Sequence, residues 1–307
     1  MIGKSGLALI VVGAVIFSHK AEATENWLEF DEFRSCSEIF ESTPFDLLLD
    51  HFFYRPELDV PRSLINQCID QSEEDGLAIS SYHAGALLVL AERDEEARPL
   101  LLMAMDAGIL EAHTFYGLSL TVEDPVVAYG VHYRSGDLGW GYGAYFAGMY
   151  KLMGLGVIQQ PEIALGLLQR ANEEGVSAAA VVLGLMYYEG DQVKQDMNLA
   201  EEMWTESSAT GNSYASYYLA TNVMLRGGSR ERAIELIRSS ASRGNATAQV
   251  MLATFLQRDE ASEEWTYWMK VWASNPRRMR DLPVSNLRAI RPATQIEKSL
   301  IKINLLW

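Results

Sequence analysis

Apolar residues recur along most of the chain at helical spacing, and small residues recur with them. A small residue, Ala179, stands four positions after Gly175, and Leu183-Gly184 stand eight and nine positions after it. Positions +4, +8 and +11 share one side of a helix, so we expect a buried stripe that a neighbouring helix approaches closely. We call this element helix A. The same template follows five other glycines, Gly76, Gly108, Gly139, Gly211 and Gly244.

A second helix, helix B, is predicted before each of these glycines. Helix-start residues precede it in several copies, as Asp124 precedes Pro125. The glycine then follows helix B, where a left-handed cap conformation costs glycine little. His132 stands seven positions before Gly139. In the other five copies that position is apolar: Ile69, Leu101, Leu168, Trp204 and Ile237.

The six glycines are separated by 31 to 36 residues, and helix pairs repeated at this period predict an all-α solenoid. The clearest copy resembles the Sel1-like repeat, a relative of the tetratricopeptide repeat. That resemblance implies helix pairs in a right-handed superhelix and a role as an adaptor for protein complexes. The matching residues are Ala179, Leu183-Gly184, Met186-Tyr187, Gly190, Val193 and Asp196, followed by Ala200, Trp204, Ala209 and Gly211.

The first 23 residues are typical of a secretory signal peptide. Lys4 precedes an apolar run over residues 6–17, and Ala21-Glu22-Ala23 forms a cleavage site, so we expect cleavage after Ala23 and export to the periplasm. The apolar run is too short to span a bilayer, and we expect no membrane span after cleavage.

The remaining chain divides into N-terminal capping helices (24–59), about six repeats (60–276) and a basic C-terminal tail (277–307).

The tail alternates apolar and polar residues near its end, a period typical of extended chain. We expect it either to cap the solenoid or to be presented to a partner.

Two cysteines, Cys36 and Cys68, are the only ones in the chain. In an oxidising compartment a disulfide is the favoured interpretation, and it would stabilise the fold by about 3 kcal/mol on loop-entropy grounds. The alternative is two buried free thiols.

Charge and motifs limit the functional classes. The net charge is −16, and the part of the chain between residues 24 and 276 carries −22. Such an acidic body repels nucleic acid and favours a basic protein partner, although it can also serve only solubility. No histidine stands in a metal-ligand motif, and no nucleophile or phosphate-binding motif occurs. We therefore predict a non-enzymatic protein with no cofactor and no metal.

Aromatic residues at +3, +6 and +7 of helix A point away from the buried stripe. Because tyrosine is enriched in interface cores, we predict that these side chains bind a partner on the concave face. The alternative is contact with the adjacent repeat. The residues are Tyr82, Tyr142, Tyr145, Phe146, Tyr214, Tyr217 and Tyr218.

Three functions remain open at this point. The first is an adaptor in a bacterial envelope assembly, with a loose resemblance to an accessory protein of the sodium-driven flagellar motor. The second is an immunity protein that neutralises a toxic effector in the periplasm. The third and most remote is a hydrolase that uses scattered acids, which would need a cleft with a strongly perturbed carboxylate.

Overall fold

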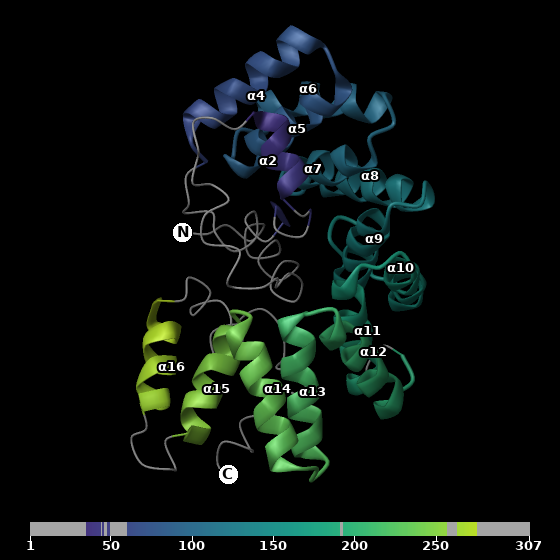
Figure 1. Cartoon of the computed structure of the whole chain (residues 1–307). Coiled ribbons are helices and arrows are strands. Elements are labelled where there is room, and N and C mark those ends of the chain that lie inside the picture. Colours follow the sequence, from purple (N-terminus) through teal and green to yellow (C-terminus); the bar gives the residue numbers. More distant parts are fainter. Residues whose placement is uncertain are drawn as a thin grey trace. The chain divides into compact units, whose positions relative to one another are not determined.

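The computed structural model describes residues 35–43, 45, 48, 49, 60–190, 193–256 and 263–274. These residues form helices and their connections, with no strand among them, and confirm the predicted all-α repeat fold (Figure 1). A short helix, α2 (Cys36–Ser42), comes first. The B and A helices then alternate as α4 (Arg62–Asp75) and α5 (Ala78–Leu90), α6 (Asp94–Asp106) and α7 (Leu110–Leu120), α8 (Pro125–Asp137) and α9 (Gly141–Met153), α10 (Pro161–Glu173) and α11 (Ser177–Glu189), α12 (Met197–Ala209) and α13 (Ser213–Leu225), and α14 (Arg230–Ser242) and α15 (Ala246–Leu256), before a last helix, α16 (Glu263–Ser274).

The glycine between the helices of each pair has the conformation that the sequence predicts. All six glycines have positive φ, from 61° at Gly76 to 103° at Gly211. A side chain is strained in this region of the backbone, whereas glycine is not. These glycines therefore end each B helix and turn the chain into the A helix.

The predicted starts of the B helices are also confirmed. The Asp124 carboxylate accepts a hydrogen bond from the Val127 amide at 3.1 Å, at the start of α8. The Asp196 carboxylate caps α12 in the same way, and the Ser229 hydroxyl caps α14. Each cap satisfies backbone donors that have no partner inside the helix.

The small residue at +9 of helix A receives a large side chain from the next B helix. A Cβ atom built on Gly85 would lie 2.6 Å from Cγ of Leu101, and one built on Gly148 would lie 3.0 Å from Cγ of Leu168. Gly184 meets the Trp204 indole in the same way. Because a methyl group would overlap these neighbours, glycine is what allows the close packing of successive repeats.

The chain forms two compact units, and the division falls after Ala179, inside α11. The first unit contains α2 and the helices from α4 to the start of α11. The second contains the rest of α11 and the helices to α16, with a core that includes Trp204, Ile237 and Trp268.

In the first unit, the predicted disulfide is present and joins two helices. Cys36 at the start of α2 is bonded to Cys68 in α4, and their Cα atoms are 5.2 Å apart. The amide of Gln71 on α4 also donates a hydrogen bond to the Ser37 hydroxyl at 2.8 Å. The N-terminal segment is therefore fixed to the first B helix.

The predicted signal peptide (1–23) and the basic tail (277–307) lie outside the described residues. Within the described part of the chain, every helix is too short or too polar to cross a membrane.

Candidate partner-binding surface

The predicted partner-binding residues lie on three A helices, one on α5, three on α9 and three on α13. Tyr142 and Tyr218 are partly exposed, and the other five side chains are buried. Tyr145 and Phe146 have no exposed surface at all. Since a partner can contact only accessible atoms, Tyr142 and Tyr218 are the members that the structure leaves available to a partner.

We call the seven predicted partner-binding residues the aromatic row. In the first unit, aromatic residues of the N-terminal segment cover part of this row. Phe40 of α2 lies with its ring centroid 5.8 Å from that of Tyr82. Phe45 lies 4.7 Å from Tyr142 and 5.7 Å from Phe115 on α7. Edge-to-face and tilted contacts at these distances are favourable for aromatic rings. The segment held by the disulfide thus fills part of the face that the sequence assigns to a partner.

Phe45 also packs against Trp140, which precedes α9, with ring centroids 5.2 Å apart. The Trp140 indole donates a hydrogen bond to the Thr114 hydroxyl on α7 at 2.8 Å. The sequence predicts only that residues 24–59 cap the solenoid, and it does not link Phe45 to the aromatic residues of helix A. No sequence periodicity connects Phe45 to residues about 70 and 100 positions further along the chain, so only the fold reveals the contact.

In the second unit, the tyrosines of α13 contact one another and the neighbouring helices. The ring of Tyr218 stacks on Trp204 at 5.6 Å and 24°, and it lies 5.3 Å from the ring of Tyr217. Tyr214 packs against Val181 of α11. These are contacts between repeats, as the alternative interpretation expects. Partner binding by the aromatic row remains a prediction.

Two histidines in the first unit are held neutral by burial. Burial lowers the pKa of His83 to about 4, although nearby Asp75 favours the charged form. Burial likewise lowers the pKa of His132 to about 3, and the neighbouring His113 acts in the same direction. His132 takes the place of the apolar residue of other repeats and stacks on Phe146 with ring centroids 4.9 Å apart. Both side chains therefore behave as core residues at neutral pH.

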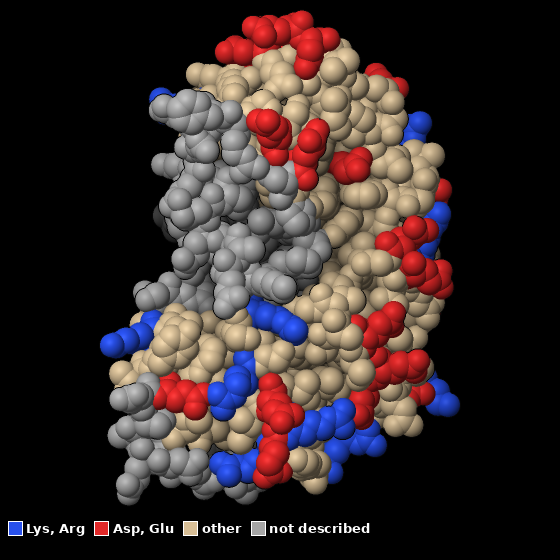
Figure 2. Space-filling view, viewed as in Figure 1, with Lys and Arg blue, Asp and Glu red and all other residues tan. Residues whose placement is uncertain are grey.

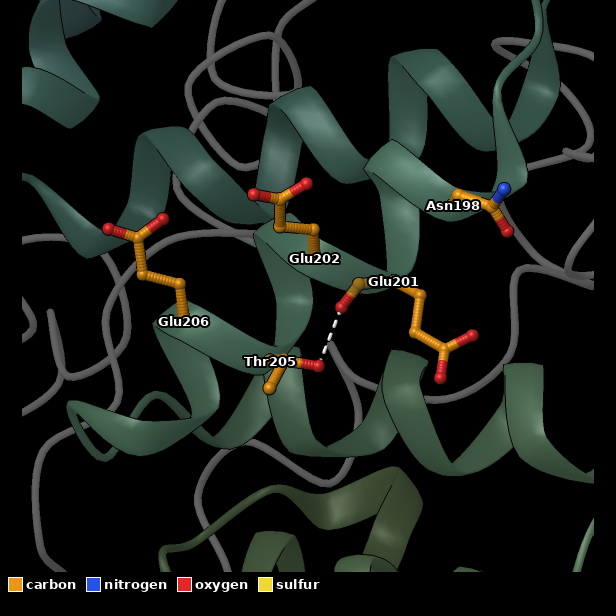
Figure 3. Close-up of a pocket in the computed structure, with 5 residues that line it drawn as sticks. All are labelled: Asn198, Glu201, Glu202, Thr205 and Glu206. Atoms are coloured by element: carbon orange, nitrogen blue, oxygen red, sulfur yellow. Dashed lines mark hydrogen bonds between the residues drawn. The ribbon is translucent and has the colours of Figure 1, made fainter.

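Acidic side chains line a surface hollow on α12 (Figure 3). Glu202 and Glu206 point to one side, while the Glu201 side chain points the other way. There its carboxylate accepts hydrogen bonds from the Asn222 amide at 3.1 Å and from the Arg226 guanidinium at 2.8 Å. Glu201 thus joins α12 to α13, and the hollow has no nucleophile and base in contact. It is lined by Asn198, Glu201, Glu202, Thr205 and Glu206.

One carboxyl group has a strongly raised pKa. Partial burial raises the pKa of Asp94, at the start of α6, to about 6, and the attraction of Arg98 only partly offsets this. Asp94 does not line the hollow on α12. Among the described residues, no three His, Cys, Asp or Glu side chains are placed to hold a metal ion.

The distribution of charge differs between the two units. Residues 60–179 contain 16 Asp and Glu residues but only six Lys and Arg residues. In Figure 2, side chains of both signs cover the helices of the second unit, whereas acidic ones predominate over α4 to α7. An acidic surface of this kind attracts basic partners over the range set by ionic strength.

Comparison with known proteins identifies the repeat. The Sel1 repeat family model matches residues 141–176, 177–212 and 213–245, so each matched repeat is one A helix and the B helix after it. No curated protein sequence matches the chain.

Several solved structures are similar to this chain, and one of them shares its fold with a TM-score above 0.5. The chain is similar to a Sel1 repeat protein from Oxalobacter formigenes, with 20% identity and a TM-score of 0.61, over 68% of this chain and 94% of that one. A protective antigen with an SLR fold from uropathogenic Escherichia coli, c5321, has 19% identity and a TM-score of 0.46, over 78% and 63%. The APC/C hetero-tetramer Cut9–Hcn1 has 13% identity and a TM-score of 0.48, over 98% and 56%.

Proposed function

We propose that this Sel1-repeat protein is a non-enzymatic scaffold that binds another protein in the periplasm, as part of a bacterial envelope assembly. Sel1 and tetratricopeptide-like repeats are typically interaction modules without catalytic activity, which supports the binding role. The periplasmic location is supported by residues 1–23, with their basic start, apolar run and cleavage site.

The packing of Phe40 and Phe45 on the A helices carries the proposal. This intramolecular contact is an example of what the aromatic row accepts, namely a short segment that presents phenylalanine side chains. Aromatic side chains bury a large apolar area with few rotatable bonds, so they serve well in protein interfaces. We propose that a partner contacts these residues where they are still accessible, at Tyr142 in the first unit and, separately, at Tyr218 in the second unit.

Affinity capture of the full mature protein from its own envelope fraction tests this function. We expect one or more proteins to be captured by the wild type and lost from a Tyr142→Ala, Tyr218→Ala double variant. Tyr267→Ala is the matched control, because Tyr267 is 57% exposed and lies on α16, outside the aromatic row. Equal capture of proteins by the wild type and both variants would contradict partner binding by the aromatic row. If the wild type captures no protein at all, the proposed scaffold function is wrong.

Export is tested separately by N-terminal sequencing of the protein from fractionated cells. We expect a mature chain that begins at Thr24 and occurs in the periplasmic fraction. A chain that retains residues 1–23 in the cytoplasmic fraction would contradict this location.

The acidic first unit favours a second candidate function, that of an immunity protein which binds a basic toxic effector. The two functions predict different neighbouring genes, either an envelope assembly or an effector. They also predict different captured proteins in the same experiment.

A further inference from the structure

A histidine of the first A helix, His83 on α5, lies beneath the N-terminal segment. The ring of Phe40 on α2 stacks on the His83 imidazole, with ring centroids 4.2 Å apart and an angle of 14° between the planes. Both side chains are buried. The same Phe40 ring contacts Tyr82, so this stack is part of the contact through which α2 covers the aromatic row.

The repeat does not require a histidine at this position. His83 stands seven positions after Gly76, and the Nδ1 atom of its buried ring has no hydrogen-bond partner among the described residues. Burying a polar atom without a partner costs stability. His83 is therefore a departure from the repeat, at the A helix on which α2 packs. The other A helices carry apolar or aromatic residues at +7, namely Phe115, Phe146, Val182, Tyr218 and Met251.

The two ends of α2 are held in different ways. Cys36 at its start is bonded covalently to Cys68 in α4. Phe40, about one helical turn later, is held only by packing on α5. A helix of seven residues has little stability of its own, so its position depends on these contacts. Loss of the stack would release the Phe40 end of α2 while the disulfide keeps the Cys36 end in place.

The surroundings of His83 favour its neutral form. Burial lowers the pKa of His83 to about 4, although the charge of Asp75, at the end of α4, favours the protonated ring. Asp75 itself is exposed, and the Leu77 amide and the Ser80 hydroxyl each donate a hydrogen bond to its carboxylate at 2.7 Å. These bonds lower the pKa of Asp75 and keep it charged. A protonated His83 that left its buried position would therefore meet water and a nearby anion.

Other charged groups on the helices packed against α5 act elsewhere. On α7, Glu111 acts on Tyr82, and His113 acts on His132. The charged groups at the start of α6 interact with one another, and Asp106 at its end is exposed. The remaining charged side chains of α2 and α4 are exposed, and they are Glu38, Glu41, Arg62, Asp70, Glu73 and Glu74.

We propose that the stack of Phe40 on His83 is an acid-sensitive latch that closes the first-unit part of the aromatic row. When His83 takes up a proton, Phe40 leaves α5 and the charged ring turns toward water and Asp75. Phe45, five residues later in the same segment, loosens from Tyr142, so Tyr82 and Tyr142 are uncovered. The inference rests on the proposed binding function and adds a condition, acid, under which this part of the row opens to a partner.

The size of the effect follows from proton linkage. His83 has a pKa of about 4 in the closed form and about 6.5 once exposed, so the open form binds the extra proton below pH 6.5. The latch is closed most firmly above that pH and weakens as the pH falls toward 4. Between pH 7 and pH 5, the equilibrium constant for opening should rise about twentyfold.

Reduction of the disulfide measures this opening. Both cysteines are buried, and Cys36 lies one helical turn from Phe40, so the bond becomes accessible when Phe40 leaves. The probe is a water-soluble phosphine, because thiols lose their reactive thiolate in acid. Mass spectrometry follows reduction of the full mature protein, and each rate is divided by that of oxidised glutathione in the same buffer. We expect a rate about twenty times higher at pH 5 than at pH 7.

An equal rate at the two pH values would overturn the proposal. It would show that attraction between the protonated imidazole and the Phe40 ring keeps the stack closed in acid.

Variants show which group acts. His83→Phe, which places at +7 the residue of the next two A helices, should abolish the rise in acid. His132→Leu is the matched control, because it removes another buried histidine of the first unit and should keep the twentyfold rise. Global unfolding would respond to both substitutions alike, and that result would overturn the latch. Phe40→Ala should speed reduction at pH 7, and a rate equal to that of the wild type would contradict the role of the stack.

Capture of envelope proteins at pH 7 and pH 5 separates the latch from the binding function. We expect the wild type to capture more protein than His83→Phe at pH 5 and an equal amount at pH 7. If reduction rises in acid but both proteins capture equally at pH 5, the proposed control of binding is wrong while the binding function stands. If reduction rises and neither protein captures anything, the binding function is wrong and the latch stands.

Discussion

The indole of Trp204 lies directly over Gly184, and its Nε1 atom donates a hydrogen bond to the carbonyl of Val181 at 3.2 Å. Trp204 is fully buried, so the indole has its polar atom satisfied and its ring surface packed on the neighbouring A helix. The residue seven positions before an inter-helix glycine thus packs on the small residue at +9 of the preceding A helix. This pair forms the packing contact between successive repeats.

Gly184→Ala should destabilise the protein by about 1–3 kcal/mol, because the added methyl group overlaps the Trp204 ring. This loss opposes the gain in helix propensity that alanine brings. Urea denaturation measures the change. Gly166→Ala is the matched control, since its exposed site is empty and the same substitution there should stabilise by about 1 kcal/mol. Equal changes in unfolding free energy at the two sites would contradict this packing contact.

Thr121→Val should cost about 1–3 kcal/mol, because Tyr150 on α9 donates a buried hydrogen bond to the Thr121 hydroxyl at 2.7 Å. Burial also raises the pKa of Tyr150 to about 12, so its hydroxyl keeps its proton at neutral pH. Tyr150→Phe removes the other partner. In a double-mutant cycle measured by denaturation, we expect the combined variant to lose less than the sum of the single variants.

His132→Leu should raise the unfolding free energy by about 1–3 kcal/mol at pH 7. Both ring nitrogens of His132 are buried without a hydrogen-bond partner among the described residues, whereas Leu101 and Leu168 fill the matching position with apolar side chains.

The same variant should gain further as the pH falls. The pKa of His132 is about 3 in the folded protein and about 6.5 when unfolded, so below pH 6.5 the unfolded state binds the extra proton and the wild type loses stability. Between pH 7 and pH 5 the advantage of His132→Leu should grow by about 2 kcal/mol. Denaturation at both pH values measures it, and a constant difference would contradict the buried neutral histidine.

Replacing both cysteines by serine should lower the unfolding free energy by about 3–4 kcal/mol, because the disulfide restricts the unfolded chain. It should also free the segment that carries Phe40 and Phe45 from the aromatic row. We expect faster amide hydrogen exchange in α5 and little change in α14. Phe45→Ala, with the disulfide intact, separates loss of the aromatic contact from loss of the covalent link.

The repeat was largely predictable from the sequence because its signals are local. A glycine that ends helix B, such as Gly175, needs only its own backbone conformation, and small residues such as Gly184 recur at fixed offsets along one helix face. Caps such as Asp196 act within three residues of their own position. The sequence alone therefore determined the helix pairs, their order and the close contacts between them.

The candidate surfaces depended on tertiary structure because they combine residues that no period connects. The sequence placed Tyr82 and Tyr142 on the exposed side of helix A, but only the fold brings Phe40 and Phe45 against them. Likewise, only the structure shows that Gly184 is packed against a neighbouring side chain and that Gly166 is open, since both are simply glycines inside helices in the sequence. Local chain chemistry fixes the repeat, whereas the contacts between distant segments decide which of its faces is free to bind.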